Sequence, residues 1–349
     1  MPVTWERTVL SRMDGIYCVE IFRRGTDIKI AAASELHDGP CRMIDFRTRE
    51  EELIWSGPGG CMNVAQWSEK GDLIGVQNFY KGAQALDAQV VWASRGEGGW
   101  DTRIVAKLPY LHHCGTVKVK DTPWVIASTL CTQREYPGDW SHPGKIQVFR
   151  MGEPGEQEQI KVIREGVVKN HGFWQGTFDN EEVTLISGNA LYRVKAPEDN
   201  NGDWTVDTLI EREISDIAVQ DIDEDGEDEI LAFEGLHGNL ATINKRVDGR
   251  WKVIYSCPME FAHGIWGGKL LGKPSFVIGS MKGQGELALL QGEADGEVSG
   301  TDCLIKRTVL ETGIGPSNVR GLCHEGRSYI LAAAREAGEL VLFELKDIK

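Results

Sequence analysis

The sequence predicts an all-β protein, a seven-bladed β-propeller, and three observations lead to that fold class. A segment rich in Val, Ile and Leu recurs at intervals of about 50 residues, and a Trp precedes it in several copies. Each copy is followed by the same succession of short β-prone segments, so that seven repeats account for all 349 residues. No helical pattern with a 3.6-residue period interrupts them. Four short strands in a repeat of this length are typical of a propeller blade.

The Val-, Ile- and Leu-rich segment is the expected outer strand of each blade. It is found at residues 5–10, 52–55, 100–105, 160–163, 204–210, 251–255 and 305–310. A Gly-rich segment follows after a short loop, and we assign it to the innermost strand. The innermost strands are expected to start near Asp14, Asn63, His113, His171, Asp216, His263 and Asn318. A β-branched or apolar run about a dozen residues later predicts the second strand, and a third strand follows it.

The first segment of the chain is expected to close the ring. Residues 5–10 precede the first inner strand, whereas the last repeat ends after a third strand at residues 340–344. The N-terminal segment therefore supplies the outer strand of the last blade, which removes an exposed sheet edge. We predict one propeller domain over residues 1–349. Two unrelated β domains are the alternative, but they would not explain the even spacing of the repeats.

Composition disfavours several classes of protein. The net charge of −15 argues against nucleic acid or an anionic membrane as a partner, because both require a basic surface. No stretch approaches the roughly 18–20 apolar residues that cross a bilayer, and the N-terminus lacks the features of a secretory signal. The eight cysteines include no Cys-x-x-Cys pair and sit mostly in apolar runs, which favours reduced, buried thiols. We therefore expect a soluble, cytoplasmic protein.

The histidines are distributed unevenly over the predicted blades. In a four-stranded blade, the loop before the innermost strand and the loop between the second and third strands lie at the same end. A single His beside a Gly is most often a feature of the turn. However, seven of the eight histidines map to this one end, and only His324 maps to the other. The seven are His112, His113, His171 and His263 before or at the start of inner strands, and His37, His142 and His237 between second and third strands.

Three of these histidines are candidate metal ligands. His113, His171 and His263 hold equivalent positions in blades 3, 4 and 6, where inner strands approach the central axis. Three neutral imidazoles can bind a divalent metal and leave coordination positions open for water or substrate. We therefore expect a divalent cation, Mn²⁺, Zn²⁺ or Mg²⁺, on these three residues. His237 and His142 are candidates for proton transfer beside it, together with Tyr136.

Other polar and aromatic residues at the same end are candidates for substrate binding. Tyr80 and Lys81 belong to blade 2, and Arg134 and Trp140 belong to a long loop in blade 3. A long, charged and aromatic loop on a rigid scaffold is typical of a substrate-binding wall. A Trp beside polar groups suits stacking against a sugar ring. His37 is a lesser candidate for the same role.

An acidic run at residues 221–229 is a second motif. Asp221, Asp223 and Asp225 with the following Gly resemble the opening of a calcium-binding loop, because alternate carboxylates converge on a hard cation. The run lacks the bidentate Glu of an EF-hand and joins two strands at the end away from the histidines. We interpret it as a structural turn at which Ca²⁺ is a possible ligand.

The acidic run and its flanks resemble the FG-GAP/VCBS class of propeller repeat. Residues 14–22, 221–229 and 236–240 are similar to segments in the propeller part of the fungal aldos-2-ulose dehydratases, and His113 is similar to a histidine there. That family continues into a β-sandwich and a cupin-like region beyond the part that this chain matches. The resemblance implies metal-assisted elimination of water from a keto-sugar. Polysaccharide lyases with a His-bound metal on seven-bladed propellers point the same way by analogy of fold.

The leading functional hypothesis is a metal-dependent carbohydrate lyase or dehydratase that catalyses β-elimination on an oxidised sugar. Its substrate would be a small carbohydrate: a keto-sugar, a keto-glycoside or a uronide. The first alternative is a glycoside hydrolase or epimerase in the same pocket, although no acidic pair is apparent at the histidine end. The second is a non-catalytic propeller that binds a partner. The regular Gly-His and Trp-Asp dipeptides of the WD-type propellers are missing from the repeats.

Overall fold

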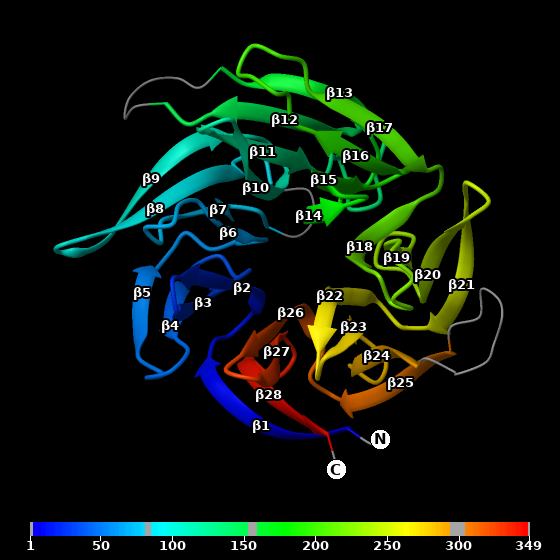
Figure 1. Cartoon of the computed structure of the whole chain (residues 1–349). Coiled ribbons are helices and arrows are strands. Elements are labelled where there is room, and N and C mark those ends of the chain that lie inside the picture. The colour runs from blue at the N-terminus through cyan, green and yellow to red at the C-terminus, as the bar shows by residue number, and fades with distance from the viewer. Residues whose placement is uncertain (1–2, 81–84, 153–158, 294–303, 348–349) are drawn as a thin grey trace. The chain divides into compact units, whose positions relative to one another are not determined.

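The computed structural model describes residues 3–80, 85–152, 159–293 and 304–347. These residues form 28 β-strands in seven four-stranded sheets, and no helix occurs among them. Each sheet is one blade, so the predicted seven-bladed β-propeller is confirmed (Figure 1). The described part of the chain contains no helix that could span a membrane.

The first four blades follow the chain order from the innermost to the outer strand. Blade 1 consists of β2 (Ile16–Arg24), β3 (Asp27–Ser34), β4 (Cys41–Asp45) and β5 (Glu51–Trp55). Blade 2 consists of β6 (Val64–Gln66), β7 (Leu73–Gln77), β8 (Gln89–Gly96) and β9 (Gly99–Lys107). Blade 3 consists of β10 (Leu111–Val119), β11 (Thr122–Thr129), β12 (Gly144–Arg150) and β13 (Lys161–Val167). Blade 4 consists of β14 (Gly172–Phe178), β15 (Glu181–Ser187), β16 (Leu191–Lys195) and β17 (Thr205–Ile210).

The remaining blades have the same four-stranded form. Blade 5 consists of β18 (Ile214–Gln220), β19 (Glu229–Glu234), β20 (Leu240–Val247) and β21 (Arg250–Pro258). Blade 6 consists of β22 (Ala262–Leu270), β23 (Lys273–Ser280), β24 (Leu287–Glu293) and β25 (Leu304–Glu311). Blade 7 consists of β26 (Pro316–His324), β27 (Arg327–Ala334), β28 (Glu339–Asp347) and β1 (Val3–Arg12).

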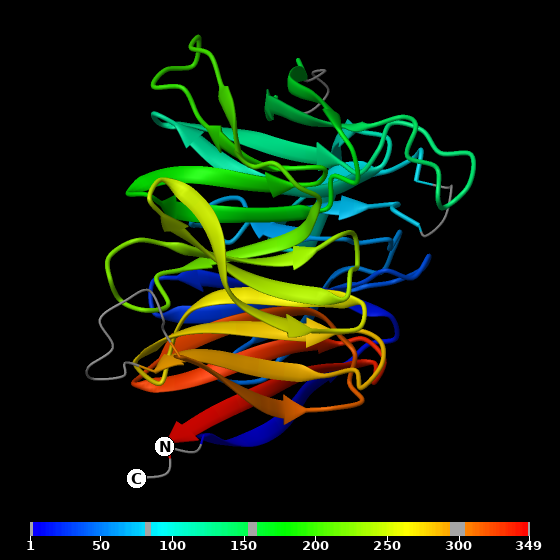
Figure 2. The same cartoon turned by 90° about the vertical axis from the view of Figure 1, so that its right-hand side faces the viewer.

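The N-terminal strand completes the last blade, as the sequence predicts. β1 pairs antiparallel with β28, from Val3 opposite Asp347 to Arg12 opposite Glu339. Both views show the two strands side by side, β1 in blue and β28 in red (Figures 1 and 2). The outer edge of blade 7 is therefore occupied by a strand from the other end of the sequence.

Burial explains why the sequence pattern identifies the inner three strands of a blade. In β27 the seven residues after Arg327 are all buried, whereas five of the ten residues of β1 are exposed. A strand that is covered on both faces has an unbroken apolar run, whereas an outer strand has one face exposed to solvent. The innermost strands start within two residues of their predicted positions. Cysteines in these runs are buried free thiols, except Cys323, which is exposed, and Cys303, which lies outside the described residues.

The chain divides into two compact units. Residues 13–176 and 182–213 form the blade 1–4 unit, which contains blades 1 to 3 and most of blade 4. Residues 1–12, 177–181 and 214–349 form the blade 5–7 unit. Each unit has its own apolar clusters of buried residues. That residues 1–349 form a single domain stays a prediction.

Candidate functional site

The strand register places each histidine at an end of its own blade. His112 and His113 are the second and third residues of β10, and His171 directly precedes β14. His263 is the second residue of β22. Since inner strands run antiparallel to second strands, the loops between second and third strands lie at this same end of each blade. Those loops hold His37, His142 and His237, whereas the remaining histidine, His324, ends its inner strand.

Three imidazoles lie together in the blade 1–4 unit. The ring of His112 lies 4.6 Å from that of His113 and 4.4 Å from that of His171, centre to centre. The Nδ1 atoms of His112 and His113 are 2.9 Å apart. One of these nitrogens must donate the proton and the other must accept it, so the two neutral rings have different tautomers. His112 and His171 are both buried, and Phe173 stacks on His113 at 5.8 Å.

Sequence reasoning did not assign a role to His112. The structure shows that it lies between the two predicted metal ligands of this unit, His113 and His171, whose own rings are 6.2 Å apart. The pair of adjacent histidines at the start of β10 is the sequence feature that could have indicated a role for His112. Successive side chains of a regular strand point to opposite faces, but the pairing of β10 with β11 is irregular between Leu111 and His113. That irregularity allows neighbouring imidazoles to meet.

In the blade 5–7 unit, three rings form a cluster. The ring of His237 lies 4.4 Å from that of Phe261 and 5.2 Å from that of His263, centre to centre, with interplanar angles of 17° and 18°. The rings of Phe261 and His263 are 6.4 Å apart, so the three nearly parallel rings form a triangle. The ammonium of Lys282 lies 4.8 Å from the centre of the Phe261 ring. The backbones of His237 and Phe261 are left-handed, with φ of 50° and 59°. Such a conformation costs a non-glycine residue about 1 kcal/mol and is concentrated at functional sites.

A backbone carbonyl sets the tautomer of His263. Its Nδ1 atom lies 2.6 Å from the carbonyl oxygen of Ser317, in the first strand of the next blade. A carbonyl oxygen only accepts, so Nδ1 carries the proton and the neutral ring has its lone pair on Nε2. Metal-binding imidazoles are commonly oriented by a hydrogen bond of this kind. The geometry at His263 therefore suits a metal ligand or a base.

The predicted metal ligands occur in both units. His113 and His171 belong to the blade 1–4 unit and His263 belongs to the blade 5–7 unit. Within each unit, imidazole and aromatic rings surround them. Imidazole nitrogens suit Zn²⁺ and related transition metals, whereas Mg²⁺ prefers oxygen. A metal site made of His113, His171 and His263 stays a prediction, and a donor set of three imidazoles favours Zn²⁺ over Mn²⁺ and Mg²⁺.

Two of the predicted substrate-binding residues are in contact. Tyr80 stacks on His37, with ring centres 4.9 Å apart, and its hydroxyl donates to the Asn78 side chain at 2.9 Å. Burial raises the pKa of Tyr80, and the nearby Asp38 adds to this shift. The His37 side chain is exposed and lies 3.0 Å from the Asp38 carboxylate. Lys81 lies outside the described residues.

The long loop between β11 and β12 has an ordered interior. The Arg134 guanidinium lies over the Trp140 ring at 4.2 Å. One face of this predicted sugar-stacking surface is thus covered by the chain itself. Asp139 accepts hydrogen bonds from the Ser141 hydroxyl and amide and from the Glu135 amide, which lowers the pKa of Asp139 to about 2. Tyr136 and His142 are exposed, Tyr136 with 60% of its surface.

The acidic run joins β18 and β19, as predicted, and a lysine forms ion pairs with part of it. Lys245 of β20 donates hydrogen bonds to Asp223 and Asp225 and lies 3.3 Å from Glu229. Asp221 accepts from the backbone amides of Asp225 and Gly226 at 3.2 and 3.0 Å. The side chains of Asp221, Asp223 and Asp225 offer oxygens that lie within 4.8 Å of one another, so Ca²⁺ at this turn stays a prediction. Burial raises the pKa of Glu229 to about 7.

Comparison with known proteins shows the fold alone. The β-propeller domain of Myceliophteria thermophila Cps50 (Swd1) has a TM-score of 0.59 and 13% identity, over 97% of this chain and 99% of that chain. BBS1N, solved in complex with ARL6DN, has a TM-score of 0.56 and 10% identity, over 98% of this chain and 97% of that chain. No protein-family model matches the chain, and neither does any curated protein. At these identities the likeness establishes a β-propeller and nothing finer.

Proposed function

We propose that the protein is a metal-dependent carbohydrate lyase that catalyses β-elimination on an oxidised sugar. The observation that carries the proposal is the hydrogen bond from His263 Nδ1 to the Ser317 carbonyl, within the cluster of His263, His237 and Phe261. It orients a buried imidazole and assigns its lone pair to Nε2.

The proposed metal has a defined task in this chemistry. Bound by His113, His171 and His263, a divalent cation would polarise the carbonyl or carboxylate of the sugar and stabilise the enolate. The His112 ring supports this arrangement, because it lies against both ligands of its own unit.

His237 is the proposed base. Elimination requires removal of the proton α to the carbonyl, followed by cleavage of the C–O bond at the β carbon. The electron pair of that bond leaves with the oxygen, which an acid protonates. The ring of His237 packs against the rings of Phe261 and His263, which leaves its in-plane nitrogens as the atoms that can accept a proton. The exposed side chains of His142 and Tyr136 are candidates for the acid.

The resemblance to the fungal aldos-2-ulose dehydratases supports the same class of reaction. One of the similar segments, residues 236–240, contains His237 and forms the loop between β19 and β20. The proposed substrate is therefore a keto-sugar or keto-glycoside, with a uronide as the variant that carries a carboxylate in place of the ketone.

The test is an elimination assay on the full chain. The protein, purified without a histidine tag, is treated with EDTA, dialysed and incubated with keto-glycosides and uronides, with or without added Zn²⁺ or Mn²⁺. A metal-dependent rise in ultraviolet absorbance from an enone or an unsaturated uronate is expected. Release of reducing sugar without that absorbance would favour a glycoside hydrolase instead. Full activity of metal-free protein would overturn the metal assignment.

Binding of a protein partner is the second candidate function. One of the similar propellers, BBS1N, was solved in complex with ARL6DN. In this chain, Leu36 and Tyr136 lie in loops at the histidine end of their blades with 47% and 60% of their surface exposed. Exposed apolar and aromatic residues are common at interfaces. No product from any keto-glycoside or uronide would favour this function over the lyase.

A further inference from the structure

We infer that the blade 1–4 unit has a second ligand site, which takes a neutral sugar. A cavity of about 520 Å³ opens among blades 2, 3 and 4, within the size range of small-molecule sites. It is lined by the second half of β10, residues 116–118, whereas His112 and His113 lie at the start of that strand. The cavity is therefore at the end of blade 3 away from its histidines.

Hydrogen bonds between neighbouring blades build the frame of this cavity. The Gln66 side chain donates to the carbonyl of Arg23 at 3.2 Å, and the Thr116 hydroxyl donates to the carbonyl of Gln66 at 3.2 Å. The Gln175 side chain continues the series with a bond to the carbonyl of Thr116, also at 3.2 Å. Gln175 donates in addition to the Thr184 hydroxyl at 3.1 Å. Side chains fixed in this way give a preorganised site.

One glycine makes the frame possible. A Cβ atom on Gly115 would lie 2.2 Å from the Gln175 side-chain oxygen and 2.8 Å from the Phe173 ring. Any other residue at this position would displace the carboxamide from the floor of the cavity. Gly115 thus allows Gln175 to reach blade 3, and the bond to Thr116 depends on it.

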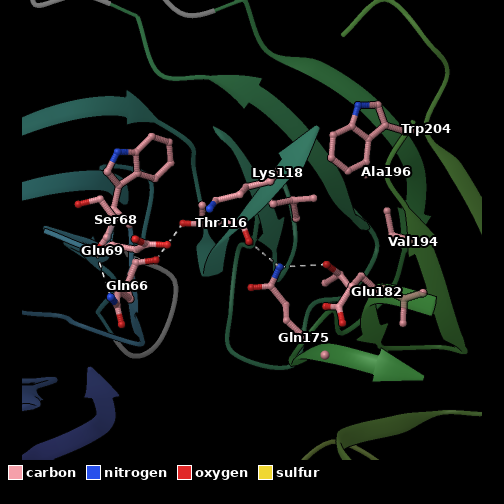
Figure 3. Close-up of a pocket in the computed structure, with 15 residues that line it drawn as sticks. Gln66, Ser68, Glu69, Thr116, Lys118, Gln175, Glu182, Val194, Ala196 and Trp204 are labelled. Carbon is pink, nitrogen blue, oxygen red and sulfur yellow. Dashed lines mark hydrogen bonds between the residues drawn. The ribbon is translucent and has the colours of Figure 1, made fainter. Parts of the chain in front are cut away.

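The walls combine aromatic rings with charges of both signs. Trp67 is half-buried, and Trp204 is held in place by Trp124, with ring centres 5.8 Å apart. Figure 3 shows Glu69 on one side of the cavity and Trp204 on the other, with Gln175 between them. The side chains of Glu69 and Lys118 are exposed at the cavity and form no hydrogen bond or ion pair with another described residue.

These walls match a neutral polyhydroxylated ring better than an ion. Glu69 and Glu182, with the net charge of −15, disfavour an anion, and the ammonium of Lys118 offsets the charge of one of the two carboxylates. Sugar hydroxyls can donate to the carboxylates and accept from the ammonium. The apolar C–H face of a sugar packs on an indole ring. The site does not require the proposed lyase chemistry, since it uses none of the histidines.

The test is isothermal titration calorimetry on the full chain in EDTA, with glucose, galactose, maltose and cellobiose. Glucuronate and glucosamine are the charged comparisons. At least one neutral sugar should bind more tightly than both charged sugars. The double variant Glu69→Gln with Lys118→Met should weaken that binding about tenfold, because Gln offers a neutral acceptor in place of the carboxylate and Met offers no donor. Ala196→Phe, which fills the cavity, should abolish it.

Two controls separate this site from the proposed lyase site. Glu97→Gln changes an exposed carboxylate away from the cavity and should leave the affinity unchanged. His263→Ala should also leave it unchanged. If no neutral sugar binds, or if only a charged sugar binds, the inference is wrong. It is also wrong if His263→Ala abolishes binding while the cavity variants retain it. If Ala196→Phe does not fold, the affinity of the double variant Glu69→Gln with Lys118→Met tests the inference instead.

Discussion

The Nδ1 atom of His263 in β22 donates a hydrogen bond to the carbonyl oxygen of Ser317 in β26, at 2.6 Å. The two residues belong to neighbouring blades, so the contact between the blades also determines which nitrogen of the imidazole carries the proton. A ring held in this way has its lone pair on Nε2 before any ligand arrives. The proposed site is thus prepared by the packing of two inner strands.

Removal of this imidazole should abolish the proposed activity. His263→Ala and His171→Ala are each expected to lower elimination by at least about 100-fold, since each removes a proposed metal ligand. The matched control is His324→Ala, at the other end of its inner strand. Initial rates from the absorbance assay and the metal content of each variant provide the readout. Equal losses in all three variants would contradict the assignment of function to the histidine end.

Asn63 is expected to be a main link between blades 2 and 3. Its side-chain nitrogen donates to the Cys114 carbonyl at 2.7 Å, and its oxygen accepts from the Cys114 amide at 3.0 Å. Asn63→Ala should lower the free energy of unfolding by about 2 kcal/mol, because two backbone groups lose their partner. Urea denaturation measures this change. Asn201→Ala, on an exposed loop, should stay within about 0.5 kcal/mol of the parent protein.

Lys245 should be essential to the acidic turn. Lys245→Met leaves Asp223 and Asp225 without their cation, and a cost of about 3 kcal/mol is expected. Millimolar Ca²⁺ should raise the melting temperature of this variant and leave that of the parent protein unchanged, since the ammonium already occupies the position between Asp223 and Asp225. Differential scanning calorimetry with Ca²⁺ or EDTA provides the measurement. A clear Ca²⁺ effect on the parent protein would show that the loop binds calcium beside Lys245.

Asp139 should make part of the stability depend on pH. Its pKa is lowered from 3.8 to about 2 by hydrogen bonds from Ser141 and Glu135. A carboxyl with a lowered pKa stabilises the folded state above its unfolded value, and that contribution disappears as the pH falls through the folded value. The difference in melting temperature between the parent protein and Asp139→Asn should therefore be largest near pH 6 and shrink between about pH 4 and pH 2. A constant difference over this range would assign the effect to packing.

Local pattern accounts for the success of the fold prediction. The apolar run at residues 329–332 indicates a strand that is covered on both faces. The segment at residues 5–10 has three polar residues between Trp5 and Val9, which indicates an outer strand with exposed side chains. The pairing of β1 with β28 also followed from the sequence. The last repeat lacks an outer strand, and the N-terminal segment is an outer strand that precedes the first blade, so the two were expected to pair. The end of the blade on which each histidine lies follows from the same register.

Contacts between blades were not visible in that pattern. Lys245 lies 20 residues beyond Asp225, and only the pairing of β18, β19 and β20 brings its ammonium into the acidic turn. The position of Arg134 over Trp140 depends on how one loop folds back on itself. Neither contact has a periodic signature, because each is made by one side chain in one rotamer.

By itself, the sequence determined the class of fold, the seven repeats, the closing strand and the uneven distribution of the histidines. The tertiary structure decided which atoms of those residues meet. It placed His112 against His113 and His171, and it directed Nδ1 of His263 to Ser317, 54 residues away. The physical reason is range: strand formation depends on neighbouring residues, whereas a hydrogen bond depends on atoms within about 3 Å that distant segments bring together.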